Sequence, residues 1–454
     1  MRNLLSAAVA AIGLATVQAF GAGNPDIFVG DTPITLTLEA PLAELFEQGR
    51  TDADHEVEGQ LTWSVGGSAA ATLAKVVISE RGHTSRQASE CAFPKLKIDL
   101  THADVANTPF AGMRAIKLGT HCDERQDEAL TAKYGRLANE RAPSREALVY
   151  RLLETAGVPT LLARPARVTY VFTDDRSRSP LTRMALLLED DQQAQDRLGA
   201  TGQITETTFG SARELFEPRD TARLAFAQAM LGNFDWCLRM FGGDIYRCDE
   251  RHPLWNILAF ERPGRRALPL VYDFDLSGIV VGRHIWFDQV FSADFADVPS
   301  AVRVEVQAQV QRTRSLFDRP LLDDTRRHFV QVRAALLREI DASTADERGK
   351  ALATEYLAAF FDAIESDARF YGPVVVDGGH VASLDPEGAR PACGDRSTVP
   401  VGTPVSAPLE VRGDQTRVRL LDALWEWTGN NRCDAVHRQA VWLPSVAIGN
   451  EYPR

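Results

Sequence analysis

The pattern of apolar and polar residues divides the chain into a strand-rich first part, a mostly helical second part and a strand-rich end. In the first part, apolar residues alternate with polar ones, which is typical of half-buried strands. Residues 20–60 predict one leading strand and loops, and clearer strands follow at residues 61–65, 74–79, 96–100, 113–118, 166–172 and 184–188.

Apolar residues with helical spacing predict the helices. Residues 144–156 form the first of these segments, and Gly157 ends it. Helix is also predicted near residues 222–231 and through residues 300–371, which are rich in Arg, Glu, Ala and Leu. Two short strand-like runs, 256–260 and 268–274, lie between them.

After Tyr371 the composition changes, because Pro and Gly recur and β-branched residues dominate. This change predicts a small β domain from about residue 373 to 454. The order of elements before it predicts an α+β, two-lobed layout. In that layout a β-rich lobe runs from residue 20 to about 190, and a helical lobe runs from about 191 to 372.

The first residues are typical of an export signal. Arg2 precedes an apolar, uncharged run from residue 4 to 17, and Val17-Gln18-Ala19 offers small residues for cleavage after Ala19. The alternative is a membrane anchor, but the run is short and rich in Ala. We therefore expect residues 1–19 to be removed and the mature chain to be periplasmic or secreted, without a membrane span.

Charge and cysteine content restrict the function further. The net charge is −12, which argues against sequence-independent nucleic-acid binding, since that needs a basic surface. Six cysteines without a CxxC spacing favour structural disulfides in an oxidising compartment over a zinc cluster. Six cysteines allow 15 pairings. Sequential pairing is the simplest, and it gives Cys91–Cys122, Cys237–Cys248 and Cys393–Cys433.

Candidate chemistry lies in three short segments that occur in order: Asn233-Phe234-Asp235 after a helix, Asn256 at the start of a strand, and Asp273-Phe274-Asp275 after an apolar strand. Phosphoryl transfer needs one carboxylate to orient the attacking hydroxyl and accept its proton. It also needs an amide oxygen and a second carboxylate to hold Mg²⁺ against the phosphates. The ordered set predicts a phosphoryl-transfer site. The alternative is that these are ordinary turn and capping residues.

Over residues 75–290 this pattern resembles the CotH-type (spore-coat protein H) secreted kinase-like proteins, an atypical branch of the protein-kinase-like fold. The resemblance implies a two-lobed kinase-like fold that uses ATP and Mg²⁺. It implies that Asp235 is the catalytic base within the Asn233-x-Asp235 loop. Asn256 and Asp273 would be Mg²⁺ ligands, with Asp275 in support.

The resemblance also implies a nucleotide site upstream. Lys117 ends a strand before the helix that carries Glu146, like the lysine and glutamate that pair in kinases, so Lys117 would hold the phosphates. Lys97 competes for this role. Glu189 follows a strand where the backbone of an inter-lobe hinge would meet adenine. The loop at residues 81–86 lies where the family has an Arg-Gly-rich segment.

Two departures from the family pattern stand out. Asn256 follows Asp235 by 21 residues (256 − 235), whereas such kinases place it five residues later. Cys237 and Cys248 bracket this insertion, so a disulfide between them would hold it as a closed loop. There is no GxGxxG segment. The histidines, among them His121, His252 and His284, are scattered and predict no metal site.

The end of the chain carries a second resemblance. Residues 404–412 and 440–443 resemble the start and end of a bacterial Src-homology-3-like barrel, which would bind cell-wall peptides or other proteins. The alternative is a β extension that packs on the main domain.

Three functions therefore remain open. The first is an exported kinase that acts on a Ser or Thr of a protein or on a small hydroxyl compound. The second is a catalytically inactive binding or envelope structural protein, and the third is nucleotidyl transfer by the same site.

Overall fold

The computed structural model describes residues 26–30, 32–64, 70–240, 252–282, 301–392, 398–399, 401, 403, 405–420 and 440–450. Several predictions concern residues outside the described part: the signal peptide, Cys248, His284, Cys393 and Cys433. None of the helices in the described part is long and apolar enough to cross a membrane.

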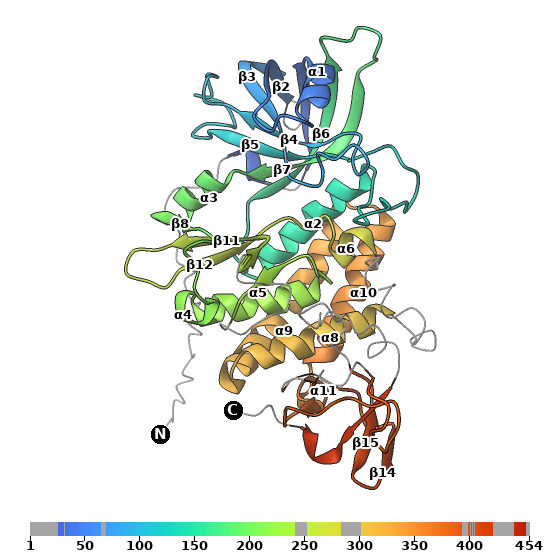
Figure 1. The fold of residues 1–454 in the computed structure, drawn as a ribbon. Coiled ribbons are helices and arrows are strands. Elements are labelled where there is room, and N and C mark those ends of the chain that lie inside the picture. The colour runs from blue at the N-terminus through green and yellow to red at the C-terminus, as the bar shows by residue number, and fades with distance from the viewer. Residues whose placement is uncertain are drawn as a thin grey trace, which may run out of the picture.

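Seven strands close into a β-barrel at one end of the molecule, in the order β1-β2-β3-β4-β5-β7-β6 (Figure 1). They are β1 (Ile34–Ala40), β2 (Glu56–Ser64), β3 (Ala71–Arg81), β4 (Lys95–Asp99), β5 (Ala115–Gly119), β6 (Ala163–Phe172) and β7 (Leu181–Glu189). β1 closes the barrel, because it pairs antiparallel with β2 and parallel with β6. A closed sheet has no unpaired edge strand.

Alternating residues of these strands point into one core, to which α1 (Leu42–Gln48) adds Leu42, Leu45 and Phe46. The short helix η1 (Asp26–Phe28) contributes Ile27 and Phe28 to the same core. Apolar residues thus fill the barrel interior, as expected for a barrel of this size.

The expected two-lobed kinase-like fold is wrong. The first strands form a closed seven-stranded barrel within a mixed α/β chain, and the parallel β1–β6 pairing closes it. Alternation along a strand indicates which side chains are buried. It carries no information about which strands pair, so an open sheet and a closed barrel have the same local pattern.

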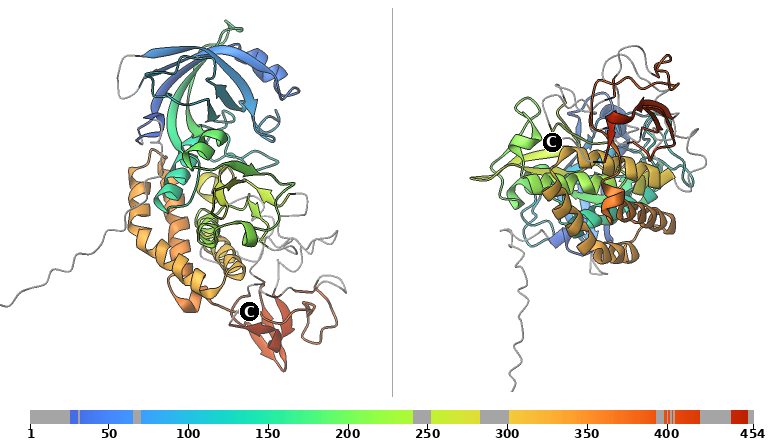
Figure 2. Two further views of the ribbon diagram at one scale, coloured as in Figure 1. Left: turned by 90° about the vertical axis from the view of Figure 1, so that its left-hand side faces the viewer. Right: turned by 90° about the horizontal axis from the view of Figure 1, so that it is seen from below.

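The helical part packs between the barrel and the C-terminal strands, and the left view of Figure 2 shows the same order from the side. Its long helices are α2 (Arg141–Thr155), α5 (Pro218–Met230), α8 (Ala301–Leu316), α9 (Arg319–Ala342) and α10 (Glu347–Ile364). Its short helices are α3 (Asp191–Arg197), α4 (Ala212–Leu215), α6 (Gly278–Val281) and α11 (Asp367–Phe370). The helix predicted at residues 144–156 is confirmed as α2, and Gly157 follows it with a φ of 65°.

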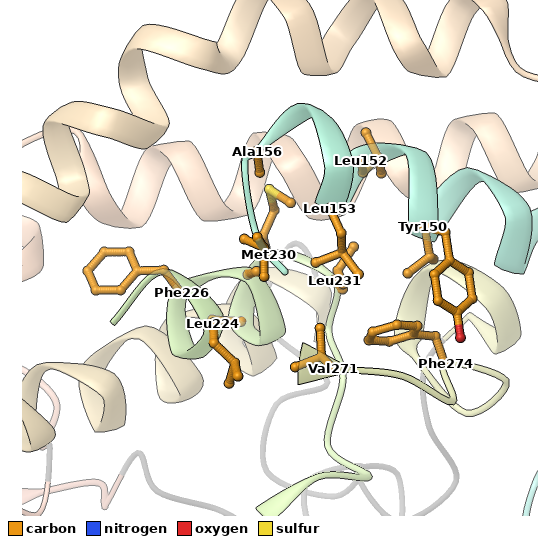
Figure 3. Packing of buried hydrophobic residues seen from close by; sticks show 14 of the residues in the cluster. Tyr150, Leu152, Leu153, Ala156, Leu224, Phe226, Met230, Leu231, Val271 and Phe274 are labelled. Atoms are coloured by element: carbon orange, nitrogen blue, oxygen red, sulfur yellow. The ribbon is translucent and has the colours of Figure 1, made fainter. Parts of the chain in front are cut away.

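Two small sheets lie beside these helices. One has the order β12-β11-β8, with β8 (Gly202–Ile204), β11 (Ile257–Glu261) and β12 (Leu268–Val271). The other pairs β9 (Cys237–Leu238) with β10 (Leu254–Trp255). Figure 3 shows side chains of α2 and α5 gathered in one core with Val271 and Phe274. That core fixes the backbone on either side of Asp273.

The C-terminal strands have a small core of their own around Val375, Val418 and Val441. β13 (Val374–Val375) pairs with β17 (Ile448–Gly449), and β14 (Glu410–Arg412), β15 (Gln415–Val418) and β16 (Val441–Pro444) form a second sheet, with η2 (Ser445–Ala447) after it. The described residues thus form two separate sheets here and not a Src-homology-3-like barrel. The domain boundaries stay a prediction.

Candidate functional site

The β11–β12 hairpin brings Asn256 and Asp273 together at its open end. Ile257 pairs with Val271, and the N–H of Tyr272 donates to the carbonyl of Asn256 at 3.3 Å. Asn256 and Asp273 both have left-handed backbone conformations, with φ of 54° and 62°. Such angles are uncommon for residues other than glycine and persist only where the surroundings hold them.

Helix α2 holds the backbone at Asp273. The N–H of Asp273 donates to the hydroxyl oxygen of Tyr150 at 3.2 Å, and the N–H of Phe274 donates to Oε1 of Glu146 at 3.2 Å. Glu146 and Tyr150 are four residues apart and therefore share one face of the helix. Two successive backbone donors of the Asp273 loop are thus bound by one helix face.

Lys95 lies between the two carboxylates of this loop. Its Nζ is 2.6 Å from Oδ1 of Asp273 and 2.8 Å from Oδ2 of Asp275. Burial by itself lowers the pKa of Lys95, but Asp273, Asp275 and Glu146 outweigh burial and raise it. Lys95 is therefore a permanent cation in the site.

Arg136 is the second cation beside Asp275. Its Nε donates to Oδ2 of Asp275 at 3.0 Å, and its Nη2 donates to the hydroxyl of Thr84 at 2.7 Å. Burial by itself raises the pKa of Asp275, but Arg136 and then Lys95 lower it to about 2. Oδ1 of Asp275 and Nη1 of Arg136 are buried and have no hydrogen-bond partner among the described residues. A polar ligand could satisfy both atoms.

Glu146 is buried beneath the same cluster. Burial raises its pKa to about 7; Lys95 lowers it, and Asp275 and Asp273 raise it further. Glu146 is therefore poised between its neutral and charged forms near neutral pH. Its state depends on whether Lys95 stays close to the carboxylates.

The loop after α5 supplies Asp235. The fully buried side chain of Asn233 accepts the N–H of Asp235 at 3.0 Å and donates to Oε1 of Gln228 at 2.8 Å. The amide Nδ2 of Asn256 donates to the carbonyl of Asp235 at 2.6 Å and to its Oδ2 at 3.0 Å. Because the amide nitrogen of Asn256 binds Asp235, the amide oxygen Oδ1 of Asn256 is directed away from the Asp235 carboxylate.

Tyr356 of α10 packs against both loops of the site. The N–H of Gly278 donates to the carbonyl of Gly232 at 2.9 Å, so the two loops are joined directly. A Cβ placed on either glycine would overlap the Tyr356 ring. The Tyr356 hydroxyl donates to Oε2 of Glu305 at 2.9 Å, which fixes the ring. The loops of Asp235 and Asp273 therefore share one support.

The predicted pairing of Lys117 with Glu146 is wrong. Nζ of Lys117 binds Asp191 instead, and it lies 6.0 Å from the centre of the Tyr272 ring. Lys97 is directly opposite Lys117 in the β4–β5 pair. The lysine that reaches the aspartates is Lys95, which the sequence did not single out.

Glu189 does not offer a free carboxylate. Its side chain is completely buried and accepts two hydrogen bonds from Arg197, at 2.8 and 2.7 Å. It also accepts the N–H of Leu162 at 3.0 Å, and its own N–H donates to the carbonyl of Leu162 at 2.9 Å. In the segment whose backbone was expected to meet adenine, the N–H of Glu189 is therefore already paired with Leu162.

The loop between β3 and β4 is tied down before it reaches Lys95. The predicted disulfide between Cys91 and Cys122 is confirmed. The guanidinium of Arg50 donates to the carbonyls of Arg86, Cys91 and Ala92 at 3.0–3.3 Å. Cys237 is also disulfide-bonded, but its predicted partner Cys248 lies outside the described residues.

His121 and His252 pair with glutamates outside the carboxylate network. His121 is buried, its Nε2 is 2.9 Å from Glu124, and burial lowers its pKa to about 4. His252 is exposed and lies 3.3 Å from Glu206. Within the described part of the chain, no three His, Cys, Asp or Glu side chains converge as a metal site. A metal ion at the Asp273 loop would therefore need an amide oxygen, such as that of Asn256, in addition to carboxylate oxygens.

No family model matches the sequence, and no curated protein matches it either. The function must therefore be argued from the site itself. The structure brings Asn233, Asp235, Asn256, Asp273, Asp275 and Glu146 into one connected network, and it leaves Lys117, Lys97 and Glu189 outside that network. Lys95, Arg136 and Tyr150 belong to the network, and sequence reasoning missed them.

Proposed function

We propose that the protein transfers the γ-phosphoryl group of ATP to a hydroxyl group of an acceptor. The observation that carries the proposal is the connected set Asp235, Asn256 and Asp273, with Lys95 against Asp273. It combines a half-buried carboxylate, an amide oxygen, a fixed carboxylate and a cation. These are the groups that phosphoryl transfer needs for positioning and charge stabilisation.

The oxygen ligands present fit a magnesium ion. Oδ1 of Asn256, the carboxylate of Asp273 and the orphaned Oδ1 of Asp275 would hold it. These are hard oxygen donors, and Mg²⁺ usually takes one or two carboxylates and completes its shell with water and phosphate oxygens. When bound, the ion supplies charge neutralisation at the phosphates.

The residues of the chain would then have separate roles. Lys95 and the free Nη1 of Arg136 would bind phosphate oxygens, and Asp235 would orient the acceptor hydroxyl. The hydroxyl oxygen attacks the γ-phosphorus and its proton passes to Asp235. The bond from the γ-phosphorus to the bridging oxygen breaks, and ADP leaves with that electron pair.

The test is a calorimetric titration of the protein with the non-hydrolysable analogue AMP-PNP, with and without Mg²⁺. Binding that requires Mg²⁺ supports the proposal. No binding in either condition would leave the alternative of an inactive binding or envelope structural protein. Nucleotidyl transfer by the same site is distinguished by product mass, because the acceptor would gain AMP instead of a phosphoryl group.

We further propose that the protein acts outside the cytoplasm, in the periplasm or after secretion, with the signal peptide cleaved after Ala19. The Cys91–Cys122 disulfide supports this, because disulfides persist in oxidising compartments. The acceptor would be an exported protein or a small hydroxyl compound, and the C-terminal strands would provide a cell-wall or protein contact. The resemblance to CotH-type proteins rests on the site residues alone.

A further inference from the structure

Trp255 combines an exposed ring with a fixed polar edge. The relative exposure of its side chain is 47%, although burial of a tryptophan side chain removes a large apolar area from water. Its indole Nε1 donates to Oδ1 of Asp235 at 3.0 Å. On β10 it pairs with the disulfide-bonded Cys237 of β9. The backbone and the indole N–H are therefore fixed, and part of the ring is open to a ligand.

The exposed chain segment near β10 is polar. Ala259 of β11 pairs with Ile204 of β8, so the exposed segment 205–208 runs toward the Asn256 end of the sheet. Arg239 links the chain just after this segment to the residue before β10, because its side chain donates to the carbonyl of Gly210 and its N–H donates to that of Pro253. The segment exposes the hydroxyls of Thr205, Thr207 and Thr208 and the carboxylate of Glu206, which contacts His252.

The groups near Asp235 carry charges of both signs. Arg136 lies within electrostatic range of Asp275, Asp273 and Asp235, and Lys95 bridges the first two. A cationic acceptor would meet Arg136, and an anionic one would meet the carboxylates. Either charged acceptor would therefore lose water of hydration beside a group of like charge. A neutral molecule with hydroxyl groups avoids this repulsion and this loss of hydration.

We propose that Trp255 is the acceptor platform and that the acceptor hydroxyl belongs to a saccharide. This inference rests on the proposed phosphoryl transfer. The C–H face of a sugar ring stacks on an electron-rich indole, and its remaining hydroxyls match the hydroxyl, imidazole and carboxylate groups nearby. Because the indole edge is bonded to Asp235, a ring stacked on Trp255 would present a hydroxyl beside the proposed base. Such preorganisation is how positioning lowers a reaction barrier.

Binding is tested without nucleotide. The full mature chain is titrated with a panel of methyl hexosides, methyl pentosides and N-acetylhexosamines, and tryptophan fluorescence and saturation-transfer NMR are measured. We expect at least one sugar to bind, Trp255→Ala to weaken binding by more than 10-fold, and Trp255→Phe to weaken it by less than 3-fold. Val446→Ala, on the C-terminal strands, is the control and should bind as wild type does. No binding by any sugar, or equal binding by Trp255→Ala, would overturn the inference.

Transfer is then measured by ³¹P NMR with Mg–ATP on the same sugars and on Ser, Tyr and Lys-rich Ser peptides. We expect transfer to a sugar, and slower transfer by Trp255→Phe, which keeps an aromatic ring but loses the N–H bonded to Asp235. Transfer to peptides alone would overturn the inference while leaving phosphoryl transfer intact. Sugar binding without any Mg–ATP binding would instead reject the proposed function.

Discussion

Lys95 and Asp273 lie 178 residues apart in the sequence, yet Nζ of Lys95 donates a 2.6 Å hydrogen bond to Oδ1 of Asp273. This contact joins the first residue of barrel strand β4 to the loop that follows β12. A second bond to Asp275 makes Lys95 the cation that a half-buried carboxylate and a buried one share. A divalent ion that binds these carboxylates must compete with Lys95, so the lysine is positioned to move toward the phosphates of a nucleotide.

Replacing Lys95 should therefore affect nucleotide and metal in opposite directions. We expect Lys95→Met to weaken Mg–AMP-PNP binding by at least 10-fold, because a phosphate contact is lost. We expect it to strengthen binding of Mg²⁺ alone, because the carboxylates lose their internal cation. Titration calorimetry measures both affinities. Lys117→Met and Lys97→Met are matched controls, and loss of nucleotide by either, with Lys95→Met unaffected, would contradict the assignment.

Asp273 and Asp235 should differ in the step that they affect. Asp273→Asn should weaken Mg²⁺-dependent nucleotide binding and abolish turnover, because it replaces a fixed, negatively charged carboxylate with a neutral amide. Asp235→Asn should retain nucleotide affinity and lower turnover by about 10²–10⁴-fold, the usual size of general acid–base effects. Circular dichroism establishes that both variants fold. Full transfer activity in Asp235→Asn would show that another residue supplies the base.

The pKa of Glu146 predicts a pH dependence of stability. Burial raises this pKa from 4.5 to about 7, so the folded state holds the proton more tightly than the unfolded chain does. The free energy of unfolding should therefore fall as the pH rises from about 4.5 to about 7. Urea titrations at several pH values should show this slope, and Glu146→Gln should reduce it.

Glu80 provides an internal comparison for that experiment. Burial also raises its pKa to about 7, against the opposing charges of Arg50 and Arg86. Glu80→Gln should remove a separate part of the same slope, and the double variant should be flatter than either single one. A slope unchanged by both substitutions would contradict the raised pKa values.

Gly278 should tolerate alanine only when Tyr356 is smaller. Its Cβ would overlap the Tyr356 ring, so we expect Gly278→Ala to destabilise the protein by about 1–3 kcal/mol, as overpacking does. The same change should lower turnover, because the Gly278 loop is bonded to Gly232 beside Asp235. In a Tyr356→Ala background, Gly278→Ala should cost much less. A double-mutant cycle by urea denaturation measures this coupling, and additive costs would contradict the proposed contact.

The Cys91–Cys122 disulfide should contribute to stability. Its two residues are 31 positions apart, and closing a loop of that length is worth about 3–4 kcal/mol in the chain-entropy description. The double variant Cys91→Ser, Cys122→Ser should lose about this amount in urea denaturation. Because the loop leads directly to Lys95, nucleotide affinity should fall as well. Unchanged affinity would show that Arg50 alone is enough to hold the loop.

The part of the site that could be predicted from sequence is the part made by local rules. The apolar pattern predicts the two short strands beside Asn256 and Asp273, and their antiparallel pairing in the structure places these two residues near each other. The Asn233-x-Asp235 loop could also be found from the sequence, because it follows a segment with helical periodicity. The sequence also indicated that Gly157 ends α2 and that Cys91 and Cys122 are bonded.

Tertiary structure alone decided which lysine enters the site and how the barrel closes. Lys95 and Lys97 share one face of β4, and Lys117 lies opposite Lys97 on β5, so side-chain alternation cannot separate the three. They differ in position along the strands, where two residues span about 6.6 Å, and only the docking of the barrel on α2 and β12 selects Lys95. Barrel closure likewise depends on the parallel pairing of β1 with β6, whose partners are more than 130 residues apart. Local periodicity records which side chains are buried, but contacts between distant segments are set by the packing of the whole chain.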